Sequence, residues 1–161
     1  MPGLLIVHHS PTTSLQQLTD AVVAGAHDEQ IAGVDVMVRS ALEATAGDVL
    51  AADGYVLGSS ANFGYMSGAL KHFFDSTFLE IGGALDPAGG ADSSASATAK
   101  RPLGVYVHGR YDTTGAIRSI LAITGALGWT QSAATVDVLG EVKPEDLEAA
   151  FNLGATLAAV L

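Results

Sequence analysis

The stretch that decides the fold runs from Leu4 to Ala26 and reads LLIVHHSPTTSLQQLTDAVVAGA. It begins with an unbroken apolar run at residues 4–7, as expected for a strand that is covered on both faces of a parallel sheet. Its second half places apolar residues at spacings of three and four, on one face of a helix: Leu15, Leu18, Val22 and Ala26. The stretch therefore predicts a strand, a turn and a helix in succession.

The turn between this strand and this helix is rich in hydroxyl groups, which come from Ser10, Thr12, Thr13 and Ser14. A helix N-terminus offers unpaired N–H groups and a partial positive charge, so such a turn is suited to phosphate. No Lys or Arg precedes Arg39, and hydroxyls, amides and the helix dipole would have to hold the phosphate. The simpler alternative is that Thr13 or Ser14 only caps the helix.

The rest of the chain alternates between strand-like and helix-like segments. Further strands are expected at residues 34–38, 54–59, 103–108 and 133–139. Helices are expected after Thr45, after a Ser67 cap, over residues 114–127 and from Pro144. This alternation predicts one α/β domain over residues 1–161, with a doubly wound five-stranded parallel sheet and helices on both faces. Residues 82–99 are rich in Gly, Ala and Ser, and we expect them to form a flexible surface loop.

Composition excludes several classes of function. Seventeen acidic against seven basic residues give a net charge of −10, which argues against nucleic acid as a partner and suits solubility or a basic protein partner. The absence of Cys excludes disulfides, thiolate metal sites and a cysteine nucleophile. The five histidines have no metal-ligand spacing, so no metal site is expected. No membrane-spanning run and no signal-peptide pattern is visible, which predicts a cytoplasmic protein.

Three loops follow predicted strands and should converge at one edge of the sheet: His9–Ser14, Ser60–Met66 and Gly109–Gly115. The first offers a seat for an anion, and the second carries the aromatic residues Phe63 and Tyr65. A flat heterocycle with a phosphate tail fits this set, although both aromatic side chains could instead pack on their own sheet. The chain lacks the Walker A, G-x-G-x-x-G and G-x-S-x-G motifs, which excludes the corresponding nucleotide-binding and hydrolase sites.

In these loops the sequence resembles the flavodoxin-like FMN-binding family, and the resemblance extends over almost the whole chain. Residues 10–15 (SPTTSL) are similar to that family's S/T-x-T-G-x-T phosphate loop. Residues 58–68 (GSSANFGYMSG) resemble the G-[ST]-P-[TV]-[YR]-F-G-x-M-[SA] signature of its quinone-reductase branch. Three positions differ: Thr13 stands in place of Gly, Leu15 in place of a hydroxyl residue, and Ser60 in place of Pro.

The resemblance implies non-covalently bound FMN and assigns residues to each part of it. Around the phosphate it places Ser10, Thr12, Thr13, Ser14 and Leu15. Along the ribityl chain and one edge of the ring it places Ser60, Ala61, Asn62, Phe63, Gly64, Tyr65 and Met66. At the other edge it places His108, Gly109, Arg110 and Tyr111. The flavin would carry the redox chemistry, so no separate catalytic residue is expected.

The leading functional hypothesis is an FMN-dependent oxidoreductase that passes electrons from NAD(P)H to a quinone-like acceptor. The alternative is a flavodoxin-type electron carrier that has no turnover of its own and exchanges electrons with a redox protein. A third hypothesis, motivated by Thr13 and Leu15, is a member of the family that has lost tight flavin binding. Association into a homo-oligomer is left open by the sequence.

Overall fold

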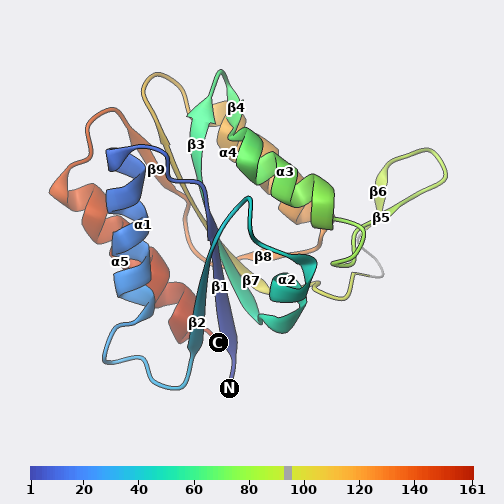
Figure 1. Cartoon of the computed structure of the whole chain (residues 1–161), viewed down its shortest axis with the longest axis horizontal. Coiled ribbons are helices and arrows are strands. Elements are labelled where there is room, and N and C mark those ends of the chain that lie inside the picture. Colours follow the sequence, from blue (N-terminus) through green and yellow to red (C-terminus); the bar gives the residue numbers. More distant parts are fainter. Residues whose placement is uncertain (93–95) are drawn as a thin grey trace.

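A parallel sheet forms the middle layer of the protein (Figure 1). The structure is a computed structural model that describes residues 1–92 and 96–161. The strands lie in the order β2-β1-β3-β7, and β8 and β9 both pair along the outer edge of β7. These strands are β1 (Gly3–His8), β2 (Asp35–Ser40), β3 (Gly54–Asn62), β7 (Pro102–Gly109), β8 (Thr130–Gln131) and β9 (Val136–Leu139). All of these pairings are parallel, which confirms the predicted sheet.

Helices cover both faces of the sheet, as the sequence predicts (Figure 1). One face carries α1 (Thr13–Ala26) and α5 (Pro144–Ala159), and the other carries α2 (Ala46–Ala51), α3 (Gly68–Thr77) and α4 (Thr114–Ala126). Alternate residues of β1 enter the two cores: Leu4 and Ile6 pack with α1 and α5, whereas Leu5 and Val7 pack on the opposite side. Burial of both faces explains the unbroken apolar run at residues 4–7.

The bounds of the last predicted strand differ from those in the structure. One strand was expected over residues 133–139, but β8 and β9 are separated by an irregular segment, residues 132–135. The Gln131 side-chain Nε2 donates to Ala133 O at 3.1 Å and contacts Thr135 Oγ1 at 3.0 Å. Backbone pairing with β7 continues as far as Ser132, whose N–H donates to Leu103 O at 2.9 Å, and the Gln131 bonds lie within the segment that follows.

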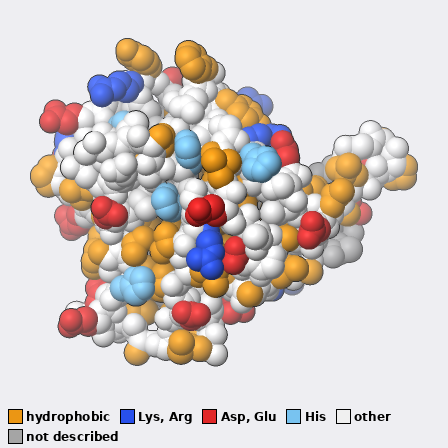
Figure 2. Space-filling model, in the orientation of Figure 1, with side chains coloured by type: hydrophobic (Ala, Val, Ile, Leu, Met, Phe, Trp, Pro, Cys, Tyr) orange, Lys and Arg blue, Asp and Glu red, His pale blue; other side chains and the backbone are white. Residues whose placement is uncertain are grey.

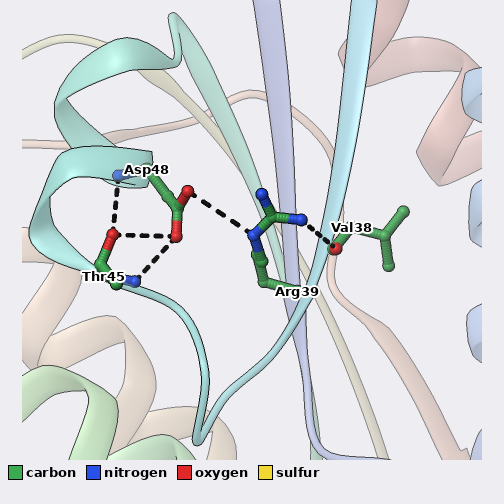
Figure 3. A network of polar contacts seen from close by, with 4 residues as sticks. All are labelled: Val38, Arg39, Thr45 and Asp48. Atoms are coloured by element: carbon green, nitrogen blue, oxygen red, sulfur yellow. Dashed lines mark hydrogen bonds and ion pairs between the residues drawn. The ribbon is translucent and has the colours of Figure 1, made fainter.

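Two predicted helix starts are confirmed. The Ser67 hydroxyl accepts a hydrogen bond from Leu70 N at 3.2 Å at the start of α3. At the start of α2, Thr45 and Asp48 form the expected reciprocal capping box (Figure 3). The Asp48 carboxylate also lies 3.5 Å from Nε of Arg39 on β2, so the cap is tied to the neighbouring strand.

A second polar network lies at the opposite end of the sheet from the carboxyl ends of β1 and β3. The Arg101 guanidinium donates to the carbonyl oxygen of Ala52 at 2.6 Å and to the Tyr55 hydroxyl at 2.8 Å. It also reaches the carbonyls of residues 49 and 50, at the end of α2. The Tyr55 ring stacks on Trp129, with ring centroids 4.0 Å apart. Arg101 therefore joins the C-terminus of a short helix to the core.

Residues 82–99 contain more order than the sequence predicts. The strands β5 (Ala84–Leu85) and β6 (Ala91–Asp92) pair antiparallel and extend away from the body (Figure 1). Asp86 holds their turn, because its Oδ1 accepts hydrogen bonds from Ala88 N and Gly90 N. The expectation of a flexible loop stays a prediction, and residues 93–95 lie outside the described part of the chain.

Candidate functional site

A cavity of about 430 Å³ opens at the carboxyl ends of the central strands. It lies where the strand order reverses between β1 and β3, which is the usual ligand position in an open parallel sheet. Its volume is within the range of small-molecule sites. Residues from all three predicted loops line it: Thr12, Ser14, Leu15, Ser60, Ala61, Asn62, Phe63, Gly64, His108, Gly109, Arg110, Tyr111 and Asp112.

The first loop presents the N-terminus of α1 to the cavity. Thr12 is the N-cap, and its hydroxyl accepts a hydrogen bond from Leu15 N at 3.3 Å. The alternative that Thr13 or Ser14 caps the helix is therefore wrong, since the cap is Thr12. The amide groups of Thr13 and Ser14 have no hydrogen-bond partner among the described residues. Together with the helix dipole, these amides form a seat for an anion.

Ser10 does not line the cavity, because a chain of hydrogen bonds turns its side chain toward the core. Its Oγ lies 2.8 Å from His8 Nδ1 and 2.7 Å from Thr19 Oγ1, and Thr19 Oγ1 lies 2.6 Å from the Tyr106 hydroxyl. Tyr106 is fully buried, and burial raises the pKa of its hydroxyl. Burial, and secondarily the nearby His9, lower the pKa of His8. Ser10 thus links the first loop to the core through hydrogen bonds and does not face the cavity.

The second loop is a tight hairpin. Strand β3 continues beyond the predicted end at Ser59 as far as Asn62, and pairs antiparallel with β4 (Tyr65–Met66). The two turn residues have positive φ angles, 50° at Phe63 and 79° at Gly64. The Phe63 ring is fully exposed beside the cavity, whereas Met66 is buried in the core and Tyr65 lies outside the cavity lining.

Ser60, on the floor of this loop, has a buried hydroxyl oxygen with no hydrogen-bond partner among the described residues. Its neighbour Ser59 is satisfied, since Ser59 Oγ donates to Ser60 O at 2.8 Å and accepts from Ser67 N at 3.0 Å. An unpaired buried hydroxyl costs about 1–3 kcal/mol. Because Ser60 is among the residues that line the cavity, its hydroxyl is a candidate partner for a polar atom of a ligand bound there.

The third loop contributes one buried and three exposed side chains. His108 is 7% exposed, and its Nε2 lies 2.7 Å from Gly140 O, so this nitrogen must carry the hydrogen that it donates. Nδ1 is then the ring nitrogen that a ligand can reach. The Tyr111 ring is 91% exposed, and Arg110 is exposed and has no ion pair among the described residues. Figure 2 shows hydrophobic side chains at this end of the molecule, over the strand-end loops.

Asp112 is a lining residue that the sequence reasoning missed. Its Oδ1 accepts a hydrogen bond from Thr114 N at 2.9 Å, just before α4, and this bond lowers the pKa of the carboxyl group. Asp112 lies within the predicted strand-end loop Gly109–Gly115, so its position in the sequence was the signal that could have placed it at the cavity.

Comparison with known proteins identifies the fold of this chain. No family model matches the sequence. An 86-residue segment is 33% identical to a flavodoxin of Aquifex aeolicus; it covers 53% of this chain and 45% of that protein, so the match spans less than half of the relative's length. A solved flavodoxin from the domain Archaea superposes with a TM-score of 0.75 at 18% identity, covering 97% of this chain and 96% of that one. The chain has a flavodoxin-like fold.

A second solved structure extends this comparison. The flavodoxin-like protein superposes on a WrbA-like protein from Agrobacterium tumefaciens with a TM-score of 0.73 at 16% identity, covering 99% of this chain and 97% of that one. A flavodoxin and a WrbA-like protein therefore both share the fold of this chain.

The flavodoxin-like protein brings most of the predicted site residues around one cavity. Four of the predicted residues lie outside its lining: Ser10, Thr13, Tyr65 and Met66. The described residues contain no group of three or more potential metal ligands. Among them, too, no helix is long and apolar enough to cross a bilayer.

Proposed function

We propose that the flavodoxin-like protein binds FMN non-covalently in the strand-end cavity and acts as an electron carrier. The arrangement of the cavity supports this proposal, because the N-terminus of α1 and the exposed rings of Phe63 and Tyr111 all line it. Phosphate would bind at the N-terminus of α1, where Thr12 and Ser14 line the cavity, and the isoalloxazine would lie between the loops that carry Phe63 and Tyr111. The bound flavin would supply the electron-transfer chemistry.

The polar groups of the cavity fit the remaining parts of FMN. The unpaired Ser60 hydroxyl would bind a polar atom of the ribityl chain or the ring edge. His108 would offer Nδ1 as a hydrogen-bond acceptor, since its Nε2 is engaged by Gly140. The aromatic rings would exclude water from the faces of the flavin. These contacts bind and orient the cofactor and require no acid or base from the chain.

The charge of the protein favours a carrier over an enzyme. The net charge is −10, and acidic side chains are spread over the face shown in Figure 2. A surface of one sign steers partners of opposite charge and raises the rate of encounter. We therefore expect the partner to be a redox protein with a basic surface around its own cofactor.

The second candidate function is reduction of a quinone-like acceptor by NAD(P)H. It is favoured by the Phe63–Gly68 segment of the quinone-reductase signature and by the exposed Arg110 at the cavity, which could bind a nicotinamide phosphate.

Two assays on the FMN-loaded protein distinguish these functions. As a carrier, the protein should pass electrons from dithionite to cytochrome c, a basic one-electron acceptor, with a rate that falls as salt rises. As a reductase, it should oxidise NADH or NADPH catalytically when a quinone is present. Turnover with NAD(P)H and quinone would replace the carrier proposal by the second candidate.

A further inference from the structure

The turn at the tip of the β3–β4 hairpin has an uncommon backbone conformation. Two-residue hairpin turns with positive φ at both positions favour Asn-Gly or Asp-Gly, whereas this turn is Phe63-Gly64. A left-handed backbone costs a larger L-residue about 1–2 kcal/mol. Because the exposed Phe63 side chain makes no compensating core contact, another part of the protein must hold the turn.

Gly115, the second residue of α4, provides this support. A Cβ atom added at Gly115 would overlap the carbonyl group of Gly64, so the turn rests directly on the helix backbone. Glycine is a poor helix former, costing up to about 1 kcal/mol relative to alanine in a helix interior. Glycine therefore occupies position 115, where the hairpin approaches the helix backbone most closely, although it stabilises a helix less than alanine does.

The start of α4 is itself fixed from two sides. The Thr113 hydroxyl donates to Asp137 Oδ1 on β9 at 2.6 Å, and Asp112 Oδ1 accepts from Thr114 N at 2.9 Å. The loop that carries Tyr111 leads directly into these bonds. The Phe63 turn and the Tyr111 loop thus share one rigid support.

We infer that Gly115 is a positioning residue for the flavin site, which sets the place of the Phe63 ring relative to the Tyr111 loop. This inference rests on the proposed function. A methyl group at position 115 has to push the Gly64 carbonyl away by more than about 1 Å, and displacements of that size disturb a fitted site strongly. The side of the cavity that carries Phe63 would then no longer fit the isoalloxazine ring of the flavin.

Titration of FMN by quenching of its fluorescence tests this inference on purified apoprotein. Gly115→Ala should weaken FMN binding by about tenfold or more. The matched control is Gly125→Ala in the same helix, where a Cβ meets nothing within 4 Å; it should leave the affinity within about twofold. In a Phe63→Ala background the loss caused by Gly115→Ala should shrink below about threefold, because the effect passes through the Phe63 ring.

Two structural measurements complete the test. Amide NMR shifts of residues 62–66 in the ligand-free protein should change in Gly115→Ala, and cooperative urea unfolding should persist. Normal FMN affinity of Gly115→Ala would overturn the inference while leaving the proposed function intact. An equal loss in both backgrounds, or loss of cooperative unfolding, would assign Gly115 to the fold and overturn its positioning role. If the wild-type protein does not bind FMN, the proposed function fails. The NMR comparison then still tests the inference, because identical amide shifts in Gly115→Ala and the wild-type protein would show that Gly115 does not hold the turn.

Discussion

The unpaired hydroxyl of Ser60 leads to a prediction in which stability and binding change in opposite directions. In the ligand-free protein this hydroxyl is buried without a partner among the described residues, at a cost of about 1–3 kcal/mol. Ser60→Ala removes the unpaired atom and leaves the strand unchanged in shape. We expect the variant to raise the free energy of unfolding by about 1 kcal/mol, which corresponds to a Tm increase of about 2–4 °C for a chain of this size.

The same substitution should weaken FMN binding. If the cofactor supplies the missing partner, Ser60→Ala loses one hydrogen bond, with a net value of about 0.5–1.5 kcal/mol. The dissociation constant should therefore rise about two- to tenfold. Thermal unfolding of the apoprotein and FMN titration measure the two effects on the same preparation.

The adjacent Ser59 provides a control with the opposite sign. Its hydroxyl is fully paired, and Ser59→Ala would leave the buried Ser67 N–H without its acceptor. This variant should lower the free energy of unfolding by about 1–3 kcal/mol. If Ser60→Ala were as destabilising as Ser59→Ala, or left FMN affinity unchanged, the reasoning from the unpaired hydroxyl would be refuted.

Two further predictions concern stability. Arg101→Ala should lower the free energy of unfolding by about 1–3 kcal/mol, because it removes charge-assisted bonds to Ala52 O and the Tyr55 hydroxyl. Urea titration followed by tryptophan fluorescence measures this change. As a control, substitution of the exposed Arg118 by Ala should leave the free energy of unfolding almost unchanged. Burial lowers the pKa of His8, so the folded state binds fewer protons than the unfolded state, and stability should fall as pH decreases below the ordinary value of 6.5. His8→Gln should flatten this part of the pH profile, and an unaltered slope would contradict the argument.

The sequence predicts the sheet and its two helical layers because apolar periodicity is a local signal. The unbroken apolar run at residues 4–7 predicts a strand that is buried on both faces, and the periodic apolar residues of α1 predict a helix that is buried on one face. Both segments are buried in this way. The cap at Ser67 is equally readable, since it depends on three neighbouring residues. The position of the cavity then follows from where parallel strands end.

Other features depend on contacts that local patterns do not contain. Ser10 turns inward because Thr19 and the distant Tyr106 bind it, which no motif in the first loop indicates. The β3–β4 hairpin forms although Phe63 disfavours its conformation, because Gly115 supports it from another element. The irregular segment between β8 and β9 likewise contains side-chain bonds of Gln131 that no local pattern indicates.

The central claim is that the cavity binds a flavin by both its ring and its phosphate. Fluorescence titration of the apoprotein with FMN and, in parallel, with riboflavin tests it most directly. We predict saturable quenching by FMN with a dissociation constant of about 1 μM or below, and clearly weaker binding of riboflavin, which lacks the phosphate. Absence of saturable quenching at about 100 μM FMN, or equal affinity for the two flavins, would contradict the account.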